Sequence, residues 1–330
     1  MYIASYITTP SLNPLQKRTR PRRLINTCTI ELEEFPSDDS VPPYAILSHR
    51  WEEGQEISYE KMVKCQSGLT TWQSIRSKSG YKKIIAACRQ AREDNHTYIW
   101  IDTCCINKGD HGQQSQDINS MFDYYRNSEV CYVYLYDFYD GARSLGESSW
   151  FSRGWTLQEL IAPLSVEFFD AKWKRCGDRK TLCSSLSYIT GIGVDILRFG
   201  YGCYTVRVGI AERMSWAIDR QTTKDEDRAY CLLGVLDVTM EPRYGEGVES
   251  AFERLSKVLH ESDRLRGEYI PKTGPDLIDR VSYRTRRVRL LEGPRTGNPK
   301  NSQEDIGSMS SGYWGKHWWR RLKLPSRSNV

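Results

Sequence analysis

Short apolar segments alternate with amphipathic ones along the first half of the chain, and this alternation limits the folds open to it. Four segments are short and apolar, as buried strands are: residues 44–48, 97–101, 130–136 and 166–169. Three segments between them predict helices: residues 81–91, 118–125 and 155–160. The pattern predicts an α/β fold with a parallel sheet and helices on both of its faces.

The pattern changes along the chain and predicts four parts. Residues 1–21 are expected to be a flexible leader, and residues 22–178 carry the α/β pattern, beginning with a short strand at 28–32. Residues 179–260 are mainly helical, and we expect this helical extension to pack on the α/β part. Its main helices are predicted at 211–218, 225–236 and 248–259.

The last part, residues 261–330, is a basic tail that we predict to be disordered. It holds 15 Lys and Arg against 8 Asp and Glu, and Pro, Gly and Ser accumulate in it. Contact of its Arg and Trp residues with an anionic membrane is the alternative. Because no nucleic-acid-binding module is recognisable, we expect no specific nucleic-acid partner.

The 330-residue chain has the features of a cytoplasmic protein. Its apolar runs are too short for a transmembrane helix or a signal peptide. The ten cysteines form no CxxC pair, and the adjacent Cys104 and Cys105 cannot readily close an ordinary disulfide. Because Cys and His residues do not cluster with zinc-ligand spacing, no metal site is expected.

Polar residues stand at the ends of the apolar segments. Ser48 and His49 close the first predicted strand, Asp102 directly follows the second, and Glu159 lies on the helix predicted at 155–160. In α/β domains, ligand-binding and catalytic residues commonly lie at the ends of strands and at the starts of helices. The same residues also fit structural roles, since Asp102 can cap a helix and His49 can be a satisfied hydrogen-bonding group.

Three blocks of the chain resemble the heterokaryon incompatibility (HET) domain of fungi. They are YAILSHRW at 44–51, WIDTCCIN at 100–107 and WFSRGWTLQELIAP at 150–163. Further segments resemble the region that follows this domain in the vegetative-incompatibility subgroup: residues 211–217, 220–223, 226–227, 229–234 and 244–247. The resemblance covers roughly residues 22–260. It implies a cytoplasmic effector of fungal non-self recognition whose activation ends in programmed cell death.

Larger relatives join this domain to a nucleotide-binding switch and to propeller repeats. The present sequence has no GxxxxGKS/T phosphate loop and no repeat of about 40 residues. The resemblance therefore implies an effector that stands alone or that a separate sensor protein activates. A homo-oligomer is expected as the active form.

HET domains are also similar, more remotely, to TIR domains, which have a flavodoxin-like α/β fold and of which some cleave NAD. That resemblance implies a catalytic role for Glu159 and makes NAD a substrate, with no cofactor required. It also implies that residues after the first strand help to hold the nucleotide. The ligand-binding residues expected on this basis are Ser48, His49, Arg50, Trp51, Asp102, Arg153 and Trp155.

A single carboxylate suits this reaction. Breaking the nicotinamide–ribose bond builds positive charge on the ribose, while nicotinamide leaves as a neutral molecule. A carboxylate beneath the sugar stabilises that charge, as in glycoside hydrolysis. Arginine side chains can offset the pyrophosphate charge, and Trp51 or Trp155 can stack on a ring.

Other functions are compatible with the same residues. Glu159 can simply cap its helix or form an ion pair there, and Trp150 and Trp155 can belong to the core. The chain would then be a non-enzymatic signalling module that acts through homotypic contacts. A degenerate, inactive paralogue is the third alternative, because Asn107 and Arg50 stand where the family usually has aspartate and threonine.

Overall fold

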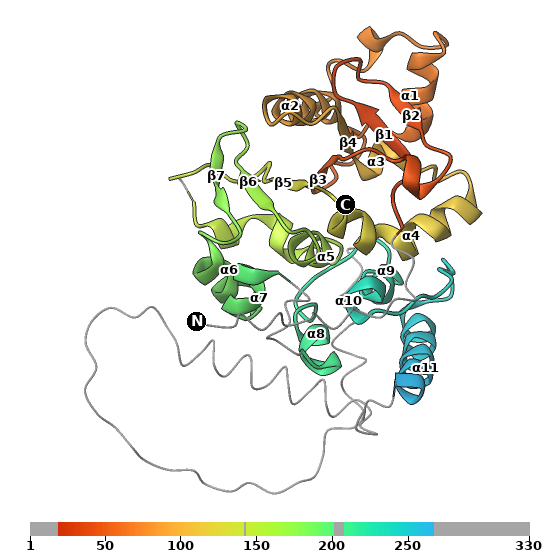
Figure 1. The fold of residues 1–330 in the computed structure, drawn as a ribbon, viewed down its shortest axis with the longest axis vertical. Coiled ribbons are helices and arrows are strands. Elements are labelled where there is room, and N and C mark those ends of the chain that lie inside the picture. Colours follow the sequence, from red (N-terminus) through yellow and green to blue (C-terminus); the bar gives the residue numbers. More distant parts are fainter. Residues whose placement is uncertain (1–18, 142, 201–207, 267–330) are drawn as a thin grey trace, which may run out of the picture.

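A seven-stranded sheet forms the centre of the computed structural model, which describes residues 19–141, 143–200 and 208–266 (Figure 1). The strand order is β2-β1-β4-β3-β5-β6-β7. The strands are β1 (Arg23–Asn26), β2 (Leu32–Glu34), β3 (Ala45–His49), β4 (Tyr98–Trp100), β5 (Val130–Tyr134), β6 (Val166–Phe169) and β7 (Arg175–Asp178). β4, β3, β5 and β6 run parallel, whereas β1, β2 and β7 are antiparallel to their neighbours. The predicted α/β class is confirmed. The parallel sheet is confirmed for its four central strands, and the antiparallel edges are an addition that the pattern does not predict.

The strand predicted at 28–32 is wrong, because most of that segment forms the turn between β1 and β2. The side-chain oxygen of Asn26 accepts the backbone N–H groups of Cys28 and Thr29, at 3.0 and 3.3 Å. Ile30 then adopts a left-handed backbone conformation with φ of 61°. This Asx-type turn satisfies backbone groups locally, and it overrides the strand preference of the β-branched residues in the segment.

Among the described residues, five α-helices lie between the strands in sequence and the others come after β7. They are α1 (Tyr59–Gln66), α2 (Ser79–Glu93), α3 (Asp102–Cys105), α4 (His111–Arg126), α5 (Thr156–Ile161), α6 (Cys183–Thr190), α7 (Val194–Phe199), α8 (Ile210–Ser215), α9 (Asp227–Tyr230), α10 (Leu233–Leu236) and α11 (Val248–Arg266). Short 3-10 helices span Asp38–Ser40, Trp72–Ser74, Leu145–Glu147 and Ser149–Ser152.

Helices cover both faces of the sheet, as the pattern predicts. α2 lies on one face, whereas α4 and α5 lie on the other (Figure 1). On the second face, Trp100 of β4 packs edge-to-face on Tyr124 and Tyr125 of α4, with ring centroids 5.6 and 5.9 Å apart. β3 is buried along its whole length. The polar residues at its carboxyl end therefore lie between two layers of helices.

The helical extension packs against α4. Asn119 of α4 exchanges two hydrogen bonds with the backbone of Met240, at 3.1 and 2.9 Å. Gly234 of α10 comes so near α4 that an added Cβ would lie 2.1 Å from the Cβ of Phe122. The buried apolar residues of the sheet layer and of the extension form one hydrophobic core.

The helix predicted at 225–236 is divided into α9 and α10. The reason lies in the packing, since α9 contacts α11 whereas α10 contacts α4 and α8. The leader predicted at 1–21 and the basic tail predicted at 261–330 lie almost entirely outside the described residues, and α11 runs to Arg266. Within the described part of the chain, no helix combines the length and apolar character that crossing a membrane requires.

Candidate active site

Ser48 of β3 and Glu159 of α5 form a buried hydrogen-bonded pair. The Ser48 hydroxyl donates to the Glu159 carboxyl group and accepts the indole N–H of Trp150 at 2.9 Å. The exposed fractions of Ser48, Glu159 and Trp150 are 0, 3 and 1%. Serine can donate one hydrogen bond and accept two, so Ser48 joins the two larger side chains without leaving its own donor unpaired.

Burial raises the pKa of Glu159 to about 7. The negative charge of Asp102 adds to the rise, whereas the hydrogen bond from Ser48, the positive charge of Arg153 and the nearby Tyr125 hydroxyl oppose it. At neutral pH the carboxyl group is therefore close to evenly divided between its protonated and ionised forms. A carboxyl group in this range can give or take a proton at physiological pH.

His49 belongs to a second polar cluster on the opposite face of the sheet. Successive side chains of a strand point to opposite faces, so Ser48 faces α5 while His49 faces α2. The Nε2 atom of His49, which is 3% exposed, lies 3.7 Å from carboxylate oxygens of both Glu56 and Asp102. Lys83 of α2 forms an ion pair with Glu56 at 2.6 Å.

The pKa of Glu56 reflects this cluster. Burial alone would raise it, but the neighbouring His49 ring and the Lys83 ammonium outweigh burial and hold the pKa of Glu56 far below its usual range. Glu56 is therefore ionised throughout the neutral range, and its ion pair with Lys83 fixes the loop before α1 against α2.

Asp102 lies beside His49, and its negative charge also acts on Glu159. It is the first residue of α3, directly after β4, and is 9% exposed. Its Oδ2 atom accepts the indole N–H of Trp51 at 2.8 Å, and its Oδ1 atom accepts the backbone N–H of Thr103 at 2.7 Å. The Oδ1 atom is also the one that lies 3.7 Å from His49. Asp102 thus holds the residues that follow β3 against the end of β4.

Two cations lie over the half-buried ring of Trp51. The Lys108 ammonium is 3.6 Å from the ring centroid and the Arg153 guanidinium carbon is 4.8 Å from it. Desolvation lowers the pKa of Lys108, and the positive charges of Arg153 and Lys224 lower it further, while the carboxylates of Asp102 and Glu56 oppose the change. Several positive charges therefore gather beside Asp102, where an anionic group would reduce their mutual repulsion.

The structure links six of the eight predicted site residues through these contacts and charges: Ser48, His49, Trp51, Asp102, Arg153 and Glu159. Arg50 is exposed, and among the described residues no hydrogen bond or ion pair ties it to the others. Trp155 points elsewhere, because its indole N–H donates to Asp227 of α9 at 3.1 Å. It joins α5 to the helical extension.

Sequence reasoning did not identify Glu56, Lys83 and Lys108 as parts of this region. Glu56 and Lys83 are 27 positions apart and come together only through packing of the loop after β3 on α2. Lys108 directly follows the second family block, but no local pattern distinguishes it from other surface lysines. These residues could be found only from their three-dimensional positions.

The cysteines of this region are not suited to nucleophilic chemistry. Burial raises the pKa of Cys105 to about 12 and that of Cys104 well above its usual value. Both side chains are therefore neutral thiols at physiological pH, and the thiolate is the reactive form. Across residues 19–141, 143–200 and 208–266, no group of three or more His, Cys, Asp or Glu side chains could hold a metal ion.

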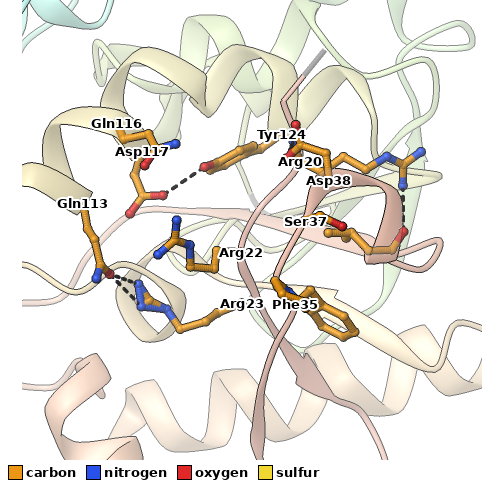
Figure 2. Close-up of a pocket in the computed structure, with 12 residues that line it drawn as sticks. Arg20, Arg22, Arg23, Phe35, Ser37, Asp38, Gln113, Gln116, Asp117 and Tyr124 are labelled. Carbon is orange, nitrogen blue, oxygen red and sulfur yellow. Dashed lines mark hydrogen bonds between the residues drawn. The ribbon is translucent and has the colours of Figure 1, made fainter. Parts of the chain in front are cut away.

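A polar cavity of about 60 Å³ opens between β1 and α4, away from Glu159. In it, Arg23 donates to Gln113, and Tyr124 donates to Asp117 at 2.9 Å (Figure 2). Burial raises the pKa of Asp117 to about 6. Its lining residues are Arg20, Arg22, Arg23, Phe35, Pro36, Ser37, Asp38, Val41, Gln113, Gln116, Asp117 and Tyr124. Several of these side chains hydrogen-bond to one another, so the cavity lies at a polar packing contact between β1 and α4.

Comparisons with known proteins agree with the first two of the three HET blocks noted in the sequence, at 44–51 and 100–107. Residues 44–138 match the family described as "Heterokaryon incompatibility protein (HET)". The chain is also 41% identical over 242 residues to the vegetative incompatibility protein HET-E-1 of Podospora anserina. That match covers 70% of this chain and 17% of the relative, so the chain spans about a sixth of that protein's length. No solved structure shows significant similarity to the chain.

The family match includes most of the site but not all of it. Ser48, His49, Trp51, Asp102 and Lys108 lie inside residues 44–138, whereas the helix that carries Glu159 follows them in the chain. The matching region supplies β3, β4 and β5, which are three of the four parallel strands. The chain is therefore a HET-domain protein, and its residues 44–138 match the family.

Proposed function

We propose that this chain acts in heterokaryon incompatibility as a cytoplasmic effector whose activation ends in programmed cell death. Two findings support the proposal: the family match over residues 44–138, and the 41% identity to a protein named for vegetative incompatibility. The match to that protein covers 70% of this chain, well beyond the residues that the family match includes. The effector would act as a homo-oligomer, switched on by a separate sensor protein.

The chemistry we propose is cleavage of the nicotinamide–ribose bond of NAD, with Glu159 as the catalytic carboxylate. The observation that carries this proposal is the contact between Glu159 and Ser48 at the carboxyl end of a parallel strand. The four parallel strands follow one another in the spatial order second, first, third, fourth, which is the order of flavodoxin-like sheets. In such sheets ligands bind at the carboxyl ends of the strands, where the order reverses. The proposed likeness to TIR domains rests on this order and on the position of Glu159.

The proposed reaction is a hydrolysis. The bond between the ribose C1′ atom and the nicotinamide nitrogen breaks, and its electron pair leaves with neutral nicotinamide. Ionised Glu159 stabilises the positive charge that develops on the ribose. Water then adds to C1′ and releases a proton, which gives ADP-ribose. Lys108 and Arg153 offset the charge of the pyrophosphate, and the ring of Trp51 between strand β3 and α3 offers a surface for stacking.

Glu159 must become accessible before it can act, because it is 3% exposed. In the enclosed state its pKa of about 7 keeps part of the molecules protonated at neutral pH. Movement of α5 away from Ser48 would let water reach the carboxyl group, lower its pKa and ionise it. Assembly of several copies is the step that we propose causes this movement, so a monomer is expected to be inactive.

The same burial favours a second function, a non-enzymatic signalling module. In that case Glu159 and Ser48 serve only to fix α5 on β3, and homotypic contacts carry the signal. A buried hydrogen-bonded carboxyl group is compatible with this role as well. A degenerate paralogue, active in neither way, is the third alternative.

Inducible expression in a fungal host, with growth and cellular NAD measured together, separates these functions. The variants are Glu159→Gln and the matched control Glu147→Gln, which changes an exposed residue. We expect the unchanged chain and the control to stop growth and deplete NAD, and Glu159→Gln to do neither. Growth arrest by folded Glu159→Gln without NAD loss would support the signalling module. Normal growth with all three proteins would support the degenerate, inactive paralogue.

A further inference from the structure

An apolar cavity of about 70 Å³ lies in the helical extension, apart from the Ser48–Glu159 pair. It is bounded by α8 and the turn after it, by residues around α9, by α11, and by the segment just before α5. Its lining residues are Gly154, Met214, Ala217, Ile218, Arg220, Thr222, Arg228, Cys231, Leu232 and Phe252. Most of this surface is hydrocarbon, and none of the lining residues is acidic.

Arg220 is the unusual residue of this cavity, since it is a buried cation that forms no ion pair among the described residues. The carboxyl group of Glu159 acts on it only from beyond ion-pair distance. It is 5% exposed. Its guanidinium donates to the backbone oxygen of Trp216 at 3.1 Å, to that of Arg153 at 3.0 Å, and to the hydroxyl of Thr156 at 2.9 Å. Its Nη2 atom is buried and has no hydrogen-bond partner.

The guanidinium keeps its charge despite this burial. Desolvation lowers the pKa of Arg220 only to about 10, so the group is protonated at neutral pH. A buried charge with no opposite charge in direct contact is unfavourable, and an unpaired buried N–H donor adds to the cost. An anion in the cavity would bring an opposite charge into direct contact with Arg220. A carboxylate matches the geometry of a guanidinium particularly well.

The apolar residues that line the cavity indicate which groups the rest of the ligand carries. Met214, Ile218, Leu232 and Phe252 offer apolar surface that a hydrocarbon tail would cover. The volume of about 70 Å³ is roughly half that of a cavity that holds benzene, so only a few carbon atoms fit inside. From this combination we propose that the cavity binds a small monocarboxylic acid, with its carboxylate on Arg220 and a short apolar chain among these four side chains.

Binding of butyrate to the purified full chain tests the proposal, with 1-butanol as the uncharged counterpart. We expect saturable binding of butyrate by calorimetry, and none of 1-butanol at the same concentrations. From acetate to butyrate the affinity should rise about fourfold for each added methylene, because each one buries more apolar surface. Equal binding of the acid and the alcohol, or of neither, would overturn the proposal.

Two variants locate the site. Arg220→Met should weaken butyrate binding at least about tenfold through loss of the charged hydrogen-bond donor, whereas Lys257→Met, at an exposed position of α11, should leave it unchanged. Ala217→Phe keeps Arg220 and should exclude the ligand by filling the cavity. The acid and alcohol comparison on the unchanged chain stays decisive if Arg220→Met does not fold. Undiminished butyrate binding by folded Ala217→Phe would place the ligand elsewhere and overturn the assignment.

Discussion

Ser48 donates a hydrogen bond to Glu159 although the two residues are 111 positions apart in the chain. The contact joins the end of β3 to the helix after β5 and lies wholly inside the protein. Because Ser48 also accepts the indole N–H of Trp150, one hydroxyl connects the strand, the segment before α5 and α5 itself. This small network fixes the position of the Glu159 carboxyl group, whose pKa burial raises to about 7.

Replacing Ser48 with alanine should destabilise the folded chain by about 1–3 kcal/mol. The substitution removes the acceptor of the Trp150 indole and a hydrogen-bond partner of Glu159, and both groups stay buried. Ser74→Ala is the matched control, since the Ser74 side chain is exposed and bonds only to the backbone of Thr71. The measurement is urea-induced unfolding at pH 7. Equal stability of the two variants would contradict the proposed importance of the network.

The pH dependence of stability should show the titration of Glu159. Its pKa is about 7 in the folded chain, against 4.5 for the unperturbed group. Between these pH values the folded state holds a proton that the unfolded state has lost. Protonated Glu159 therefore makes its full contribution to the free energy of unfolding below pH 4.5. That contribution, about 3 kcal/mol in total, is lost as the pH rises towards 7.

Comparison with Glu159→Gln isolates this effect. The difference in unfolding free energy, unchanged chain minus variant, should fall steadily between pH 4.5 and 7. Asp117, whose pKa is raised to about 6, contributes a change of the same sign to both proteins and cancels in the difference. Urea unfolding at intervals of half a pH unit gives the curve. A difference that stays constant across this range would mean that the Glu159 carboxyl group is not protonated in the folded chain.

Gly234→Ala should disrupt the contact between the helical extension and α4. The new Cβ would lie 2.1 Å from the Cβ of Phe122, which leaves no room without a shift of α10. We expect a loss of about 1–3 kcal/mol in the free energy of unfolding. Gly209→Ala serves as the control because no atom lies within 4 Å of its added Cβ. If both variants unfold at the same urea concentration, α10 does not pack on α4 as described.

Lys108 and Arg153 should contribute to NAD binding through the proposed contact with its pyrophosphate. Lys108→Met and Arg153→Met should each weaken NAD binding roughly tenfold, because each removes one charged hydrogen-bond donor. Lys64→Met, at an exposed position of α1, should have no effect. Equilibrium binding followed by tryptophan fluorescence checks this. If all three variants bind NAD equally well, the two cations lie outside the nucleotide site.

Much of the central fold could be predicted because the signals are local. β3, β5 and β6 are short apolar runs, and α2 and α4 carry clear helical periodicity, so length and spacing alone place them. The turn at Cys28–Ile30 could not be predicted in this way. Its course depends on the Asn26 side chain, which satisfies two backbone N–H groups that a strand would have paired with a neighbour. The antiparallel edge strands likewise depend on pairing between distant segments.

The candidate site was only partly predictable for the same reason. Ser48 and Asp102 stand at strand ends, where local pattern and topology together suggest a site. Lys108 and Arg220 gain their importance from neighbours far away in the chain, such as the Trp51 ring and the backbone of Arg153. Trp155 shows the opposite case, because a residue inside a family block turns out to join α5 to Asp227 of the extension.

Release of nicotinamide from NAD by the purified chain tests the central claim most directly. The chain is held in clusters by fusion to a tetrameric coiled coil, and folded Glu159→Gln in the same fusion is the comparison. We predict steady nicotinamide release by the clustered unchanged chain and none above background by the clustered variant. Equal release by both proteins, or none by the unchanged chain, would contradict the assignment of Glu159 as the catalytic carboxylate.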